Sequence, residues 1–194
     1  GKLFDGYRNK VWQTEDMDGT QVIRVWSYIT ANEGFAKRTL DYMSFMLTGF
    51  LASLFIRKVD LVVGTSPQFF VVCAAYMTGL FKRVPWVFEL RDLWPDSIRT
   101  LGALENSLLL DLLERLELFL YRKANQIVSV TESFKCNLVG RGIDANKISV
   151  ITNGVIRSNF SPQEKDTELV NLYGLQGKFV AGYIGTHGMA HALD

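Results

Sequence analysis

The chain has 194 residues, of which 48% are hydrophobic and 12% aromatic, so it is long enough to bury a full core and does not have the composition of a disordered protein. Its 21 basic and 20 acidic residues give a net charge of +1, which argues against nucleic acid as a partner because nucleic-acid-binding modules carry a strong basic excess. The two cysteines, Cys73 and Cys136, stand alone in apolar stretches rather than in a spaced framework, a usage typical of a reducing compartment.

Short apolar runs alternate with longer helical patterns along the chain, and this alternation predicts parallel strands joined by crossover helices. The predicted strands cover residues 22–26, 59–63, 85–90, 126–130, 148–152 and 179–184. The predicted helices cover residues 35–57, 69–82, 104–123, 132–141 and 164–173. The strand runs are continuously apolar, as in sheets with both faces covered, so we expect an α/β fold with a doubly wound, Rossmann-like parallel sheet.

Two apolar stretches raise the question of a membrane span. Residues 42–56 are uncharged but shorter than the roughly 20 residues that a spanning helix needs. Residues 61–81 are long enough, but Gly64-Thr65-Ser66-Pro67-Gln68 interrupts them. There we expect a helix start, with the Ser66 hydroxyl as cap and Pro67 in the first turn. Both stretches are therefore interpreted as buried or interfacial elements.

A polar, irregular stretch over residues 153–166 has the composition of a connector between compact units. We expect a first domain over residues 1–159, a linker with a short helix over 160–177, and the truncated start of a second Rossmann-like domain over 178–194. One strand and one turn of helix are too little for a core of their own.

The densest group of functional side chains follows the predicted strand 85–90 and contains Arg91, Asp92 and Trp94. Ligands of open α/β sheets bind at the carboxyl ends of strands. The Arg91 guanidinium can bind carboxylate or phosphate, Asp92 can accept hydrogen bonds from hydroxyl groups, and Trp94 can stack on an apolar face. The alternative is a structural ion pair between Arg91 and Asp92, with Trp94 covering the core.

Small polar residues follow three other predicted strands at the same edge of the sheet. They either bind substrate hydroxyl groups or simply cap a helix or a turn. These candidate substrate-binding residues are Thr65 and Ser66, Thr131 and Glu132, and Asn153 and Gly154.

The last predicted strand runs into a tight turn that contains Gly185, Thr186 and Gly188, and the backbone N–H groups of the helix start that follows can bind phosphate. The same segment holds both histidines, His187 and His191, at the i, i+4 spacing of metal ligands. A catalytic zinc takes three protein ligands, and the glutamate of the H-E-x-x-H motif is replaced here by glycine. We therefore expect no metal site.

Three segments, in this order, carry a resemblance to a known family: PWVFELRDLWPDSI, KANQIVSVTESFKCNLVGRGIDANKISVITNGVIRSNFSP and YIGTHGMAHALD. The chain resembles glycosyltransferase family 4, within the bacterial subgroup that builds O-antigen, capsule and exopolysaccharide chains. The resemblance runs from about Val22 to the end of the chain. Arg91 stands where many relatives have a histidine, and Ile156 stands where an aspartate usually follows the Asn-Gly pair.

The resemblance implies the N-terminal, acceptor-side half of a GT-B architecture, in which two Rossmann-like domains face each other across a cleft. It implies sugar transfer from a nucleotide sugar, which we expect to be UDP-linked, to a lipid-linked saccharide acceptor, with retention of configuration and no metal or other cofactor. The turn from Gly185 to Gly188 would approach the donor diphosphate. We expect Arg91 and Asp92 to be the catalytic residues.

The resemblance further implies that a first strand with a glycine-rich acceptor loop precedes residue 1, and that the basic residue and paired glutamates that hold the donor follow residue 194. We therefore expect these 194 residues alone to be inactive and to bind nucleotide sugar weakly. We expect a cytoplasmic protein in peripheral contact with the inner face of the plasma membrane. The alternative is a noncatalytic membrane-surface scaffold or binding module of the same fold, because apolar segments surround Phe45 and Phe69.

Overall fold

The computed structural model of the chain describes residues 3, 6–30, 35–94 and 107–185. The chain divides into two compact units, Gly1–Thr152 and Asn153–Asp194. The expected boundary at residue 159 stays a prediction, as does the nature of the second domain. Within the described ranges, no helix combines the length and the apolar character that crossing a bilayer requires.

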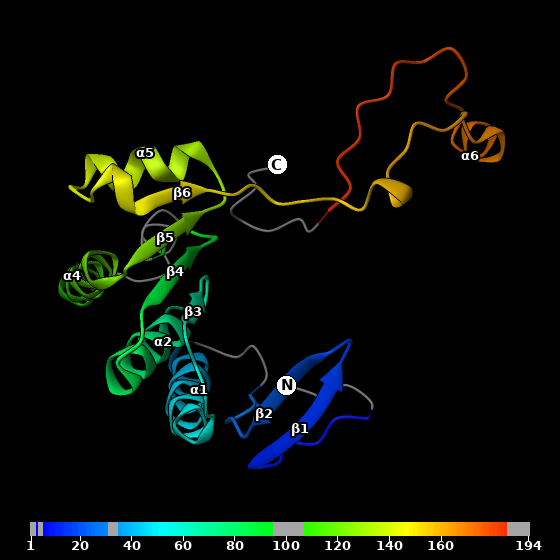
Figure 1. Cartoon of the computed structure of the whole chain (residues 1–194). Helices are drawn as coiled ribbons and strands as arrows, with labels where there is room; N and C mark the ends of the chain where they lie inside the picture. Colours follow the sequence, from blue (N-terminus) through cyan, green and yellow to red (C-terminus); the bar gives the residue numbers. More distant parts are fainter. Residues whose placement is uncertain (1–2, 4–5, 31–34, 95–106, 186–194) are drawn as a thin grey trace. The chain divides into compact units, whose positions relative to one another are not determined.

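The first unit is built around a four-stranded parallel sheet in the order β3-β4-β5-β6 (Figure 1). The strands are β3 (Val62–Thr65), β4 (Trp86–Leu90), β5 (Gln126–Ser129) and β6 (Ile148–Val150). They form where the sequence has short apolar runs. Each of β4, β5 and β6 follows a helix that returns the chain to the same end of the sheet. The predicted α/β fold, a parallel sheet flanked by helices, is confirmed.

The described part of the first unit contains four α-helices, and their bounds lie within a few residues of the prediction. They are α1 (Phe35–Phe55), α2 (Phe69–Lys82), α4 (Ser107–Lys123) and α5 (Glu132–Gly140). Residues 104–106 of the predicted helix 104–123 lie outside the described residues. A short 3-10 helix, η1 (Ala145–Lys147), leads into β6.

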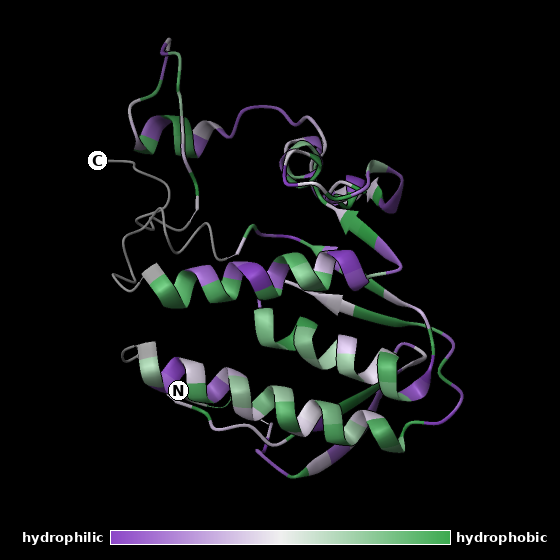
Figure 2. Cartoon of the chain, turned by 90° about the vertical axis from the view of Figure 1, so that its left-hand side faces the viewer, coloured by the Kyte–Doolittle hydropathy of each residue, from purple (hydrophilic) through white to green (hydrophobic). Residues whose placement is uncertain are grey.

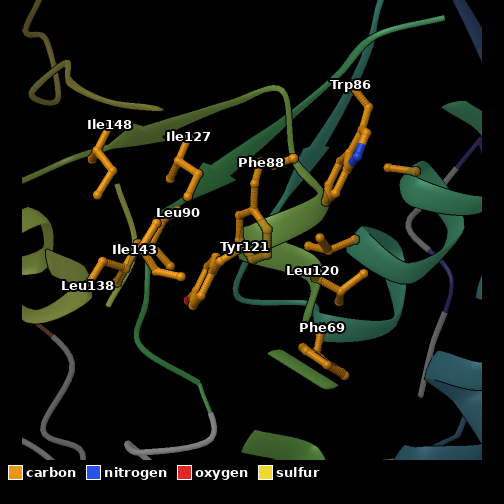
Figure 3. Close-up of a cluster of buried hydrophobic side chains, with 13 residues drawn as sticks. Phe69, Trp86, Phe88, Leu90, Leu120, Tyr121, Ile127, Leu138, Ile143 and Ile148 are labelled. Atoms are coloured by element: carbon orange, nitrogen blue, oxygen red, sulfur yellow. The ribbon is translucent and has the colours of Figure 1, made fainter. Parts of the chain in front are cut away.

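The core lies between one face of the sheet and the helices α2, α4 and α5, all on the same side of it (Figures 1 and 3). The register places Phe88, Ile127 and Ile148 next to one another on successive strands, and all three are buried. The ring of Phe88 packs on that of Tyr121 from α4, with centroids 4.7 Å apart. Burial of such side chains is the main source of stability for this unit.

The opposite face of the sheet is more open. Val63 on that face is 55% exposed, and its neighbour Val87 is half-buried. We expected helices on both faces, whereas in the described part of the chain α2, α4 and α5 pack on one face.

The predicted strand 22–26 does not join the parallel sheet, and this part of the prediction is wrong. The chain there forms an antiparallel hairpin of β1 (Trp12–Met17) and β2 (Thr20–Val25). The connection is Asp18-Gly19, and both residues have positive φ angles of 52° and 80°. Such a two-residue Asp-Gly turn suits the twist of a hairpin, so the preceding polar strand β1 becomes the partner of β2.

The second unit holds little regular structure in its described part. It contains the 3-10 helix η2 (Arg157–Asn159) and α6 (Thr167–Leu172), which lies inside the predicted helix 164–173. The predicted strand 179–184 is absent, and Phe179 and Ile184 are 96% and 102% exposed. A strand is stabilised by a hydrogen-bonded neighbour, and the described residues of this unit provide none.

Candidate functional site

An open groove of about 710 Å³ lies where β3 and β4 end at their carboxyl termini. This is the edge at which open α/β sheets bind ligands. Four of the predicted site residues meet there: Thr65, Ser66, Arg91 and Asp92. The lining is completed by Phe45 of α1, Val71 of α2, and Pro67 and Gln68 of the loop between β3 and α2.

Ser66 connects the ends of the two strands. Its side chain is almost fully buried, at 3% exposure, and its Oγ accepts hydrogen bonds from the backbone N–H groups of Arg91 (2.8 Å) and Asp92 (3.3 Å). Its own N–H donates to the carbonyl of Glu89 (2.9 Å). The hydroxyl of Ser66 therefore holds the backbone segment that carries Arg91 and Asp92.

The expected helix cap at Ser66 and Pro67 is wrong. The helix α2 begins at Phe69, and its N-cap is Gln68, which makes no hydrogen bond from its side chain to the helix start. The reason is the position of β4, since the Ser66 hydroxyl is occupied by the loop that follows that strand.

Thr65 and Glu89 form a second polar connection beneath the groove. The two residues are in register on β3 and β4, and Thr65 Oγ1 donates to Glu89 Oε2 over 2.6 Å. The other carboxylate oxygen of Glu89 can accept a further hydrogen bond. Glu89 is not among the predicted site residues, although an acidic residue in the otherwise apolar strand WVFEL is a usable signal for a polar site.

The side chains of Arg91, Asp92 and Trp94 differ in their exposure. Arg91 is exposed, whereas Asp92 and Trp94 are half-buried. The indole of Trp94 stacks on the buried Phe69 of α2, with centroids 4.6 Å apart and ring planes at 22°. Trp94 thus packs against the core, as the structural interpretation of this segment expected, and its contact with substrate stays a prediction.

Thr131 and Glu132 lie at the end of β5 and do not line the groove. Thr131 is the N-cap of α5, since its side chain accepts a hydrogen bond from the N–H of Phe134 (3.2 Å). Glu132 is exposed in the first helical turn, where a negative charge is favourable. Capping accounts for Thr131, and the binding role of both residues stays a prediction.

The remaining predicted site residues belong to the second unit. Asn153, Gly154 and Gly185 are exposed there. Thr186 and Gly188 lie outside the described residues, as do both histidines, so the phosphate-binding turn and the expected absence of a metal site stay predictions.

Comparison with known proteins gives one family. Residues 10–158 match the model of the family described as Glycosyltransferase Family 4. The match covers more than half of the chain and includes every residue that lines the groove. No curated protein matches the chain.

Proposed function

Since the chain belongs to glycosyltransferase family 4, we propose that it takes part in sugar transfer from a nucleotide sugar to a lipid-linked glycan acceptor during the synthesis of bacterial surface polysaccharide. Membership of the family supports sugar transfer in general. The finer proposal is carried by one observation, the groove at the carboxyl ends of β3 and β4.

The lining of the groove suits a saccharide linked to a lipid through phosphate. The exposed guanidinium of Arg91 can bind a phosphate with two parallel hydrogen bonds. The carboxylate of Asp92 can accept a hydrogen bond from the reacting hydroxyl of the acceptor. The side chains of Phe45 and Val71 supply apolar surface beside these polar groups.

In the proposed reaction, the acceptor hydroxyl oxygen forms a bond to the anomeric carbon of the donor while the bond from that carbon to the nucleotide phosphate oxygen breaks, and the hydroxyl proton passes to the departing phosphate. The configuration at the anomeric carbon is retained and no metal is used. Arg91 stabilises negative charge and Asp92 orients the attacking hydroxyl. The donor, a UDP-linked sugar in our proposal, binds to the second Rossmann-like domain, with its diphosphate at the turn from Gly185 to Gly188.

The test is a transfer assay on the natural full-length protein with a panel of UDP and GDP sugars and a lipid-diphosphate saccharide acceptor. We expect transfer with at least one donor. Arg91→Ala and Asp92→Ala should each lower kcat/KM by about tenfold or more, which corresponds to at least about 1.4 kcal/mol of transition-state stabilisation. The exposed residues Arg115 and Asp60, which do not line the groove, provide matched alanine controls of the same charge.

Two outcomes would contradict the proposal. Transfer that is unchanged in both groove variants, together with a lower melting temperature, would favour the structural ion pair. Absence of transfer with every donor, while the protein remains folded, would favour the noncatalytic scaffold.

A further inference from the structure

The polar side chains of the groove come from the ends of strands and the loops after them, and not from the helices beside it. The helix α2, which contributes Val71 to the lining, is hydrophobic along almost its whole length (Figure 2). The side chain that α1 contributes is Phe45. Recognition of a polar ligand therefore depends on how the ends of β3 and β4 fix the direction of their hydrogen bonds.

The hydroxyl group of Thr65 has its single proton committed to Glu89. Alternate residues of a strand lie on the same face of a sheet, and Thr65 and Glu89 come two residues after Val63 and Val87 on the open face. There Thr65 Oγ1 donates to Glu89 Oε2 over 2.6 Å. An ionised carboxylate only accepts hydrogen bonds, and a hydroxyl group has one proton. Thr65 therefore has no proton left for a ligand in the groove.

The oxygen of the same hydroxyl group can still accept. Thr65 is half-buried and lines the groove, and none of the residues that the structure describes donates a hydrogen bond to its Oγ1. The neighbouring Ser66 does not offer this, because it is only 3% exposed. In addition, both acceptor positions of its Oγ are taken by the backbone N–H groups of Arg91 and Asp92. Toward the groove, Thr65 is thus a hydrogen-bond acceptor.

We propose that Thr65 accepts a hydrogen bond from a hydroxyl group of the acceptor saccharide, and that Glu89 is the positioning residue that gives Thr65 this polarity. Glu89 does not line the groove, so it acts through Thr65. The hydroxyl group bound by Thr65 is distinct from the reacting one, which binds to Asp92 in the proposed function. The inference rests on that function in taking a saccharide as the ligand.

This polarity makes the site selective for a hydrogen-bond donor. A ligand hydroxyl group donates to Thr65 Oγ1, whereas a fluorine atom at the same position has no proton and meets an oxygen that cannot donate either. The guanidinium of Arg91 carries only donors, so it cannot replace Thr65 as the acceptor. A ligand without the hydroxyl group leaves the Thr65 oxygen unpaired, so it should bind about tenfold more weakly.

The test measures binding to the natural full-length protein by isothermal titration calorimetry, without any donor sugar. The probes are farnesyl diphosphates linked to glucose, galactose or N-acetylglucosamine. In the probe that binds most tightly, each hydroxyl group is replaced in turn by fluorine. We expect one position at which fluorine weakens binding to the wild type by about tenfold or more, and binding to Thr65→Val by no more than about twofold. Fluorine at the hydroxyl group that binds to Asp92 should weaken binding to both proteins.

Further variants separate positioning from a general structural role. Glu89→Leu frees the Thr65 hydroxyl to rotate, so the effect of fluorine at the same position should fall below about threefold. Thr65→Ser keeps the hydroxyl group and should restore the wild-type effect. Gln126→Leu is the matched control, because Gln126 lies on the same face of the sheet and donates to Ser149 Oγ over 3.0 Å, outside the groove. It should leave the pattern unchanged. Thermal unfolding verifies that the variants are folded, and Glu89→Ala replaces Glu89→Leu if the latter is not.

Several results would overturn the inference. They are a pattern in Thr65→Val equal to that of the wild type, a full effect of fluorine in the Glu89 variant, and no binding of any probe. An equal loss of affinity for every analogue would also overturn it, because it would indicate a structural role alone. Sugar transfer is measured in the separate assay described above. Transfer without this binding pattern would refute the inference alone, and the binding pattern without transfer would refute the proposed function alone.

Discussion

Replacement of Gly64 by alanine should destabilise the first unit by forcing β3 and α2 apart. A Cβ atom at this position would lie 2.6 Å from the Cβ of Ala75 and 3.3 Å from the Cα of Val72. Carbon atoms in contact are ordinarily about 3.5–4.0 Å apart, so α2 would have to move by about 1 Å. Overpacking of this kind costs about 1–3 kcal/mol. For a protein of this size, the melting temperature should fall by roughly 2–12 °C.

The source of the cost can be separated with a second substitution. Ala75→Gly removes the atom that the new methyl group would meet, at a helix-propensity cost of about 1 kcal/mol. The double variant Gly64→Ala/Ala75→Gly should therefore be more stable than the sum of the two single variants indicates. Gly49→Ala in α1 serves as the control, because its Cβ would lie 3.8 Å from the ring of Phe45, an ordinary contact. It should stabilise the helix by roughly 0.5–1 kcal/mol.

Urea unfolding followed by circular dichroism measures the stability of the wild type and all four variants under the same conditions. The reasoning is refuted if Gly64→Ala unfolds at the same urea concentration as the wild type. It is also refuted if the two single variants are strictly additive, because the loss would then come from something other than the contact between β3 and α2. Since Thr65 and Ser66 follow Gly64 directly, a displaced β3 should also alter the groove.

We make five further predictions, the first four at single side chains and the last on donor binding. Ser66→Ala removes the hydroxyl oxygen that accepts hydrogen bonds from the backbone N–H groups of Arg91 and Asp92. Urea unfolding should therefore show a free energy of unfolding that is lower by about 1–3 kcal/mol. Unchanged stability would contradict the role given to Ser66. Arg141→Ala removes the cation that lies 2.7 Å from the carboxylate of Glu117, a residue that is 1% exposed. The free energy of unfolding should fall by about 3–5 kcal/mol in the same measurement. A loss below about 1 kcal/mol would show that the ion pair is not effectively buried. Burial raises the pKa of the Cys73 thiol from 9.0 to about 11, so a maleimide at neutral pH should label the exposed Cys136 in the folded chain and both cysteines in urea. Between pH 9 and about pH 11 the unfolded chain loses the Cys73 proton before the folded chain does, so Cys73→Ala should reduce the decline of stability in that window. Calorimetric titration of these 194 residues with UDP and GDP sugars should give dissociation constants above about 100 μM, and tighter binding would reveal a donor site that we have not identified.

Local pattern was sufficient for the elements of the parallel sheet. The run PWVFEL predicts a buried strand without reference to any other part of the chain, and β4 covers five of its six residues. The leucine stripe of residues 109–120 predicts a helix that packs on a core, and the buried Leu120 and Tyr121 of α4 do so. The edge that carries the groove also followed from the alternation of strands and helices, since parallel strands end at the same side of a sheet.

The pairing of strands and the partners of polar groups were decided by the tertiary structure. An apolar run shows that a strand forms, but the run 22–26 does not show that its neighbour is the polar strand β1 rather than the parallel sheet. Within its own segment Ser66 has the pattern of a helix cap. Its hydroxyl oxygen instead accepts a hydrogen bond from the backbone N–H of Arg91, 25 residues away. Glu89 gains its partner only because the register places Thr65 beside it. Periodicity in a sequence reports which side chains are buried, whereas a hydrogen bond across a sheet depends on where two distant strands come to lie.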